Sequence, residues 1–350
     1  MAHNLATDDA TGEIAMWCTG TREAVWHSLG QRTPDAQSWQ EVMQLAHLDW
    51  QVEKRPLYAN LPTNPLGGLF KIPDQCAIFR SDNSAYLGVV GDGYTIMQNK
   101  SAFDFIDYLL QARNGAHYES AGALGKGERI WVMAKLPDTI RIAGTEDISK
   151  LYLLIATAHD GSMAYTAKLV AERVVCENTL AVALGEVGAA VRIKHTKSAQ
   201  ARLAMGLKFM ASVGNSIQTL NEKMNILASR KLTRESASAV LDRLFPPTMN
   251  DDGSEKTSKR RENVLATVLG LFDSNDKNAI PQVRGTAYNL LNAITEYTDH
   301  FRPARITDSR KDYSDVQARA ENALFGTGEK LKVSALEALL ELTADDAVLV

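Results

Sequence analysis

Two apolar runs joined by a short polar turn constrain the fold of this chain more than any other feature. The first run covers residues 151–155, the second covers residues 164–176, and the turn between them at 159–162 reads His-Asp-Gly-Ser. An Asp–Gly pair between apolar runs rich in β-branched residues indicates a hairpin, because glycine readily adopts the positive φ of a tight turn. The stretch therefore predicts a buried β-hairpin.

The residues after this hairpin carry charge of one sign. No Asp or Glu occurs between Glu186 and Glu222, and five cations lie in that interval: Arg192, Lys194, Lys197, Arg202 and Lys208. A positively charged stretch attached to a buried hairpin is a candidate anion-binding surface. The formal net charge of the whole chain is −4, which argues against a nucleic-acid binder that works through overall basicity. A nucleic-acid hypothesis therefore rests on local charge.

Length and composition indicate a globular protein. The chain has 350 residues, 45% of them hydrophobic, which is enough for one large or two ordinary domains with a real core. Its three cysteines are far apart and form no CxxC pair, so we expect no disulfide framework and no zinc knuckle, and a cytoplasmic location. No signal-peptide pattern occurs, and no apolar run approaches the roughly 18 residues that span a bilayer. We expect no membrane association.

Turn residues and apolar periodicity divide the chain into an N-terminal arm (1–33), an α+β core domain (34–190) and a helical C-terminal region (191–350). The elements expected in the core domain are a helix over 34–47 capped at Thr33-Pro34, an extended segment over 48–58, a loop over 60–73, a meander of strands over 76–80, 86–90 and 94–98, a helix from about 99 to 113, and a hairpin of 117–124 with 129–136 that Pro137 ends.

The C-terminal region is expected to be mostly helical. The expected helices cover about 198–230, a shorter segment ending at Pro246-Pro247, and 262–272, 283–301, 314–325 and 329–343. Residues 248–261 are polar and charged and predict a mobile loop. The predicted fold class is α+β: a β-meander and hairpins crossed by helices, followed by a mostly α-helical C-terminal part.

Binding of single-stranded DNA is our first functional hypothesis. It requires Lys or Arg side chains along the phosphate backbone and aromatic rings on which bases stack. The candidate DNA-binding residues are Lys168, Arg173, Arg192, Lys194, His195, Lys197, Arg202, Lys259, Arg260 and Arg261. A solvated surface explains the basic residues of the hairpin region equally well, and a solvated helix start is the alternative for the last three. No metal or cofactor is expected, and the partners would be single-stranded DNA and further copies of the chain.

Two other functions stay open. The first is a metal-dependent enzyme acting on nucleic acid or nucleotides, with His159, Asp160, Glu172 and His195 converging if the strands pair as predicted. Against it, the chain has no HExxH, GxSxG, helix-opening GxGxxG or EF-hand motif, and Asp at a turn usually serves turn geometry. The second is a phage protein that binds a host protein, which would leave few chemical signatures.

Several distinctive motifs are distributed along the chain. They are Trp26-His27-x-Leu29-Gly30, Leu48-Asp49-Trp50-x-Val52, Gln98-Asn99-x-x-x-Phe103, His159-Asp160-Gly161-Ser162, Arg173-Val174-Val175-Cys176-x-Asn178-Thr179-Leu180, His195-Thr196 and Asn292-Ala293-x-Thr295-Glu296-Tyr297-x-Asp299-His300. Together they resemble a phage- and plasmid-encoded family, the domain-of-unknown-function family 932. The sequence departs from the family at Ala24-Val25, where Pro is frequent, and at Ala171-Glu172, where Thr-Pro is frequent.

At the level of fold the chain is similar to phage single-strand annealing proteins of the Red-beta and RecT type. That similarity implies rings or filaments that hold single-stranded DNA in a basic groove without metal-dependent chemistry. A shared fold does not by itself carry a shared function, so this implication is an analogy.

Overall fold

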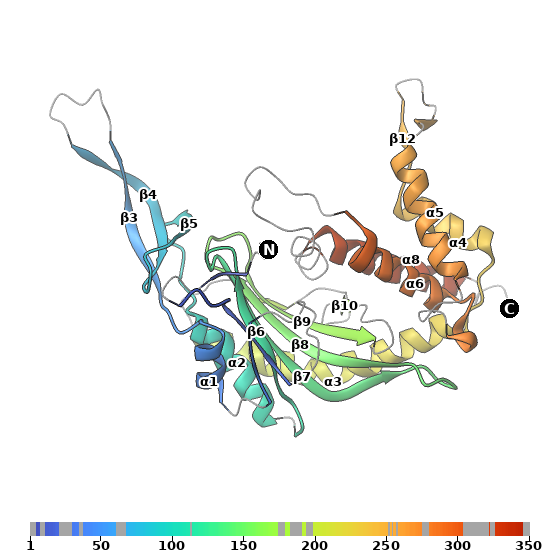
Figure 1. Ribbon diagram of the computed structural model, residues 1–350, viewed down its shortest axis with the longest axis horizontal. Coiled ribbons are helices and arrows are strands. Elements are labelled where there is room, and N and C mark those ends of the chain that lie inside the picture. The colour runs from blue at the N-terminus through green and yellow to red at the C-terminus, as the bar shows by residue number, and fades with distance from the viewer. Residues whose placement is uncertain are drawn as a thin grey trace.

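The computed structural model places the predicted hairpin at the centre of the molecule. It describes residues 5–7, 11–20, 30–34, 38–60, 68–112, 114–173, 179–182, 191–193, 199–250, 253, 255–256, 258–274, 280–303, 322 and 326–345. The fold is α+β, as predicted, with helices concentrated in the C-terminal part (Figure 1).

An eight-stranded sheet forms the centre of the fold. Its strands are β1 (Met16–Thr19), β2 (Gln31–Thr33), β6 (His117–Leu124), β7 (Arg129–Arg141), β8 (Ile148–Ala158), β9 (Tyr165–Arg173), β10 (Thr179–Val182) and β11 (Val191–Ile193). They follow the order β10-β9-β8-β7-β6-β1-β2, and β11 also pairs with β9. The β1–β2 pair is parallel, whereas the other pairs are antiparallel.

The predicted hairpin of residues 151–176 is confirmed as β8 and β9 as far as Arg173, and its last residues, 174–176, lie outside the described residues. Its turn contains Gly161, whose φ of 78° lies in the left-handed region that favours glycine. Alternate residues of β8 are buried on opposite faces, with Leu153 in the larger core and Leu154 in a second cluster. Because both faces are covered, the strand is a continuous apolar run and does not alternate with polar residues.

The hairpin of β6 and β7 is confirmed, and its pairing ends at Lys135, just before Pro137, but strand β7 itself does not end there. The pairing of β7 with β8 shifts register between Lys135 and Thr139 and then resumes as far as Arg141. Proline lacks an N–H and is tolerated where a bulge interrupts the ladder. Pro137 therefore lies in an irregularity of a strand that continues past it.

A smaller three-stranded sheet, β3-β4-β5, projects from the body of the molecule (Figure 1). It consists of β3 (Val52–Asn60), β4 (Leu69–Arg80) and β5 (Tyr86–Gly91). The predicted meander was wrong in its third strand, because residues 94–98 form none. The Gln98 side chain instead donates to the Val52 carbonyl and accepts from the Val52 N–H, at 3.0 and 2.8 Å. The predicted loop over 60–73 was also wrong at its end, where β4 begins at Leu69.

Three helices cover one face of the large sheet. They are α1 (Trp39–Leu45), α2 (Asn99–Ala112) and α3 (Ala199–Ser229), and they contact β6, β7 and β8. The predicted start of the first helix was wrong: Ser38 is the N-cap, because its side chain accepts from the Glu41 N–H. Thr33 instead ends β2, where it pairs with Thr19.

The remaining helices form the C-terminal part. They are α4 (Arg234–Leu244), α5 (Lys259–Asp273), the short 3-10 turn η1 (Pro281–Val283), α6 (Ala287–Glu296), the π-helical turn η2 (Tyr297–Phe301) and α8 (Thr327–Asp345). The single predicted helix over 283–301 is thus divided into η1, α6 and η2. The predicted helix over 314–325 falls almost wholly outside the described residues.

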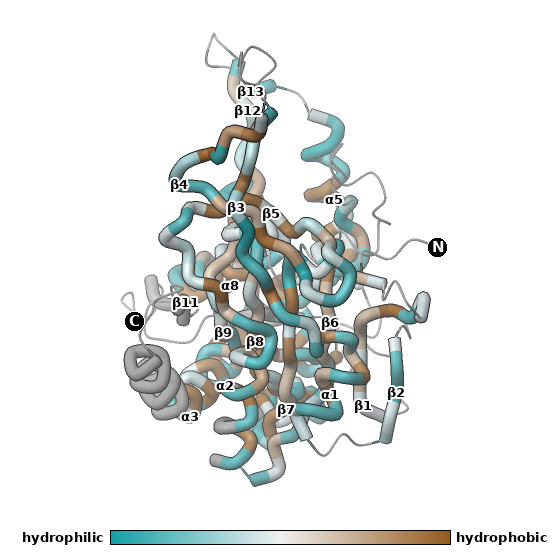
Figure 2. The backbone as a smooth tube through the Cα atoms, turned by 90° about the vertical axis from the view of Figure 1, so that its left-hand side faces the viewer, coloured by the Kyte–Doolittle hydropathy of each residue, from teal (hydrophilic) through white to brown (hydrophobic). Residues whose placement is uncertain are grey.

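The predicted mobile loop over 248–261 was wrong where the structure describes it. Strands β12 (Thr248–Met249) and β13 (Glu255–Lys256) pair as a short antiparallel ladder. Helix α5 then begins at Lys259, because the Ser258 hydroxyl accepts from the Arg261 N–H and caps it. In Figures 1 and 2 this hairpin and the outer part of β3 and β4 both project upward, and in Figure 1 they stand at opposite ends of the long axis of the molecule.

Candidate nucleic-acid interface

The exposed cations of the described structure include a group at the outer end of α5. Lys256 on β13 and Lys259 and Arg260 in the first turn of α5 are exposed, and we refer to these three as the α5 cation cluster. Arg261 points elsewhere: its guanidinium forms an ion pair with Asp242 and donates to the Phe245 carbonyl oxygen at 2.6 Å. The cluster therefore presents positive charge to solvent while Arg261 attaches α5 to α4.

Among the cations predicted on the large sheet, Lys168 lies in a different environment. Lys168 is 6% exposed, and its Nζ lies 2.5 Å from a Glu329 carboxylate oxygen at the start of α8. Arg192 lies in β11 directly opposite Thr166 of β9. Arg173 ends β9 and Arg202 lies near the start of α3, but the side chains of Arg173, Arg192 and Arg202 are not described. Lys194, His195 and Lys197 lie outside the described residues.

The three described residues of the enzyme hypothesis, His159, Asp160 and Glu172, are not gathered at one place, and His195 lies outside the described residues. His159 and Asp160 lie in the β8–β9 turn, whereas Glu172 pairs with Lys150 near the other end of the hairpin. Strands rise about 3.3 Å per residue, so the nine residue steps from Lys150 to His159 span roughly 30 Å. Asp160 caps its own turn, since one carboxylate oxygen accepts from the Ser162 N–H at 2.8 Å.

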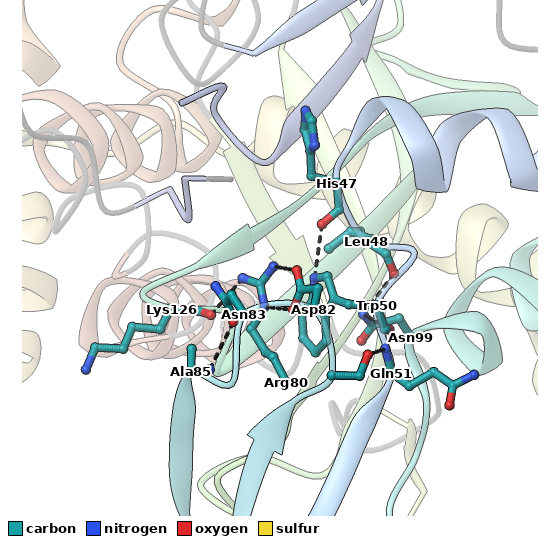
Figure 3. Close-up of polar contacts among 11 residues, drawn as sticks. His47, Leu48, Trp50, Gln51, Arg80, Asp82, Asn83, Ala85, Asn99 and Lys126 are labelled. Carbon is teal, nitrogen blue, oxygen red and sulfur yellow. Dashed lines mark hydrogen bonds and ion pairs between the residues drawn. The ribbon is translucent and has the colours of Figure 1, made fainter. Parts of the chain in front are cut away.

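His159 is part of a buried cluster of polar and aromatic side chains between the two sheets, formed by His159, Asn99, Trp50 and Arg80. We call this cluster the joint. The Nε2 of His159 lies 2.9 Å from the Asn99 side-chain oxygen, and its ring packs edge-on against Trp50, with ring centroids 5.5 Å apart. The Asn99 amide donates to the carbonyl oxygens of Leu48 and Trp50 (Figure 3). The histidine therefore connects the β8–β9 turn to α2 and to the segment that leads into β3.

Arg80 completes this joint from β4. Its guanidinium lies over the Trp50 ring at 4.4 Å from the centroid and donates to Asp82 and to the Lys126 carbonyl oxygen (Figure 3). A buried arginine is tolerable when its charge is paired and its donors are satisfied. The joint therefore connects the three-stranded sheet to the β6–β7 turn.

Two glycines allow the close approach of these elements. A Cβ at Gly88 of β5 would lie 2.8 Å from the Asp160 Cβ. A Cβ at Gly127, where φ is 106°, would lie 2.9 Å from the Trp50 ring. A larger residue at either position would push the two sheets apart.

Tyr94 gives the joint an expected response to high pH. Its hydroxyl donates to the Ala158 carbonyl oxygen at 3.2 Å, and burial together with the charge of Asp160 raises its pKa to about 12. Folding therefore favours the protonated, neutral form of Tyr94. The stability that this preference contributes is complete below the pKa of the unfolded chain, about 10, and is lost as pH rises through the folded pKa of about 12. Tyr94→Phe should remove one late-titrating group from the tyrosinate absorbance titration and flatten the stability loss in this range. An unchanged titration would contradict the assignment.

The sequence analysis missed a group of exposed aromatic residues on the three-stranded sheet. Tyr58 on β3 and Phe70 on β4 are each 51% exposed, and both lie on the two-stranded outer part of this sheet (residues 58–60 and 69–71), which we call the β3–β4 arm. A signal was present in the sequence, since residues 56–73 contain a single charged residue, Lys71. We interpreted much of that segment as a loop because of its prolines and glycines.

No three His, Cys, Asp or Glu side chains in the described residues are grouped as metal ligands would be. None of the helices in the described part of the chain combines the length and the hydropathy that crossing a bilayer requires.

Part of the chain matches the model of a known protein family. The model of the family "Domain of unknown function (DUF932)" matches residues 86–323, which is more than half of the chain. The chain belongs to this family. The resemblance inferred from motifs is confirmed at this level, although two motifs, at 26–30 and 48–52, precede the match. No curated protein and no solved structure has significant similarity to the chain.

The DUF932 region contains only part of the surfaces described above. It begins at Tyr86, the first residue of β5, and includes the large-sheet strands from β6 to β11 and the α5 cation cluster. The β3–β4 arm lies before the region and α8 lies after it. The carboxylate that pairs with Lys168 therefore comes from outside the DUF932 region.

Proposed function

We propose that this chain binds single-stranded DNA and works as an oligomer, in annealing or recombination on a mobile element. The observation that carries the proposal is the α5 cation cluster, three exposed cations within five residues at a projecting end of the molecule. Contacts between Lys or Arg and phosphates release condensed counterions and supply most of the sequence-independent affinity for DNA. The cluster can make such contacts without displacing an ion pair to any residue in the described part of the chain.

Two further features support this function. Arg192 lies in the acid-free interval after Glu186, and its position in β11 puts part of that interval at the margin of the large sheet. Strands β2 and β10 stand at the two ends of the strand order. Edge strands present N–H and C=O groups to which a second chain can add, so they offer a route to an oligomer. Lys168 is left out of the proposed contacts because its charge is paired within the protein.

The salt dependence of binding tests the proposal. Affinity for an oligothymidylate of about 40 nucleotides should fall linearly on a double-logarithmic plot against salt, at roughly −0.7 per phosphate contact. Replacing Lys256, Lys259 and Arg260 together with alanine should reduce the magnitude of the slope by about 2, because three contacts are lost. Fluorescence anisotropy between about 50 and 200 mM salt measures both values.

Lys223→Ala is the matched control. Lys223 is exposed on α3, a different helix from the one that carries the α5 cation cluster, and its replacement should leave the slope unchanged. Absence of binding by the unaltered chain, or binding that does not depend on salt, would reject the proposed function. Light scattering with and without the oligonucleotide tests the oligomer, which should exceed the mass of a single chain.

A further inference from the structure

Exposed apolar side chains are concentrated on the three-stranded sheet. Among the residues that the structure describes, the large hydrophobic side chains exposed to solvent are Tyr58, Leu69, Phe70, Tyr86, Val89, Ile226, Met249 and Phe301. The first five lie on β3, β4 or β5, although these strands form a small part of the chain. Grouped exposure of this kind marks an interaction surface, whereas isolated exposed apolar residues need no explanation.

The two arm aromatics lie on opposite faces of the ribbon. Tyr58 is directly opposite Lys71 and Ala59 is directly opposite Phe70. Directly opposed residues of an antiparallel pair share a face, and successive residues alternate between faces. One face therefore carries Tyr58 beside Lys71, and the other face carries Phe70.

The arm carries positive charge and no carboxylate. No Asp or Glu occurs between Glu53 and Asp74. Arg55 forms an ion pair with Glu53, and the Lys54 ammonium donates to the carbonyl oxygens of Asp92 and Tyr94, so these cations are held near the base of the arm. Lys71 is exposed beside Tyr58. The β3–β4 arm thus combines two aromatic rings, Tyr58 and Phe70, with one cation, Lys71.

This combination fits single-stranded DNA better than a protein surface. A flat protein partner would cover one face of the ribbon and leave the other ring in water. Unpaired bases can stack on rings on either face, because every base has an aromatic face, and a cation next to a ring can contact the adjoining phosphate. The arm and the β12–β13 hairpin that precedes α5 both project upward in Figures 1 and 2, at opposite ends of the long axis of the molecule in Figure 1, so a strand long enough to reach from one to the other could contact both.

We propose that the β3–β4 arm is a base-stacking element, in which Tyr58 and Phe70 stack on bases of single-stranded DNA and Lys71 contacts the neighbouring phosphate. This inference rests on the proposed function and assigns to the arm the contacts that the α5 cation cluster cannot provide. It also gives a role to residues that precede the DUF932 region. The arm acts through stacking, whereas the cluster acts through charge, and the two contributions respond differently to salt.

Replacing Tyr58 and Phe70 together with alanine in the full chain separates these contributions. Stacking of a base on a ring is worth about 1–3 kcal/mol, so affinity for the oligothymidylate should fall at least about 30-fold. The slope against salt should stay the same, because no charge is removed. Lys71→Ala should instead reduce the magnitude of the slope by about 0.7. An oligonucleotide containing 2-aminopurine should show quenching that the alanine variant loses.

The exchange variant Tyr58→Phe with Phe70→Tyr keeps both rings and is the matched control, with an affinity close to that of the unaltered chain. Circular dichroism should show that all variants keep the fold, since both rings are half exposed. If the unaltered chain binds and the alanine variant binds equally well, the stacking role is overturned while the proposed function stands. A smaller particle with unchanged affinity would likewise overturn it, in favour of contact between copies. If the unaltered chain does not bind, the proposed function itself fails.

Discussion

Lys332→Ala is expected to lower the free energy of unfolding by about 3–5 kcal/mol, the cost of breaking a buried ion pair on one side. Lys332 on α8 is 0% exposed, and its Nζ lies 2.8 Å from an Asp299 carboxylate oxygen on η2. Removing the ammonium leaves a buried carboxylate without this partner, and the lost solvation is not recovered. Urea unfolding followed by circular dichroism measures the change as a lower midpoint with little change in slope.

Lys330→Ala is the matched control for this prediction. Lys330 lies two residues earlier on the same helix and is exposed, so its replacement should change stability by no more than about 0.5 kcal/mol. Replacing both partners, with Lys332→Met and Asp299→Leu, should recover part of the loss because no charge then stays buried. A loss below about 1 kcal/mol for Lys332→Ala alone would show that the pair does not anchor α8.

Trp50→Ala is expected to cost about 3–5 kcal/mol, a magnitude typical of removing a buried aromatic side chain. Trp50 is buried, supports the Arg80 guanidinium and the His159 ring, and donates its indole N–H to the His47 carbonyl oxygen at 3.0 Å (Figure 3). Without Trp50, the Arg80 guanidinium and the His159 ring lose the side chain that both of them contact. Hydrogen exchange should quicken first in β3, β4 and β5, since that sheet depends on the joint for its orientation.

Two further variants serve as controls for Trp50→Ala. Trp50→Phe keeps a ring and should cost clearly less than Trp50→Ala. Tyr86→Ala removes a half-exposed ring that packs edge-on against Phe79 in the same small sheet, and it should cost clearly less than Trp50→Ala. Uniform destabilisation by Trp50→Ala, with no preference for the small sheet in hydrogen exchange, would contradict the role of the joint. If the joint orients the arm, the same variant should also weaken DNA binding.

The sequence predictions succeeded where an element depends on residues close together in the chain, and failed where it depends on contacts between distant residues. The hairpin turn at Asp160-Gly161 and the one around Gly125 and Gly127 were predictable because positive φ at glycine is a local property. The strand proposed over residues 94–98 failed for a different reason. The Gln98 side chain imitates a strand partner for Val52, 46 residues away, and no local pattern records this.

Local chemistry in the sequence by itself determined the central hairpin, the α+β class, the long helix after the basic segment and the cap-and-turn residues that bound many elements. Each of these depends on residues within a few positions of one another. The tertiary structure alone decided which charges are available. Lys168 is neutralised by Glu329, 161 residues later, whereas the α5 cation cluster stays in solvent. Charge patterns in the sequence show where cations occur, but only the packing of distant segments decides which of them keep their hydration and can meet a phosphate.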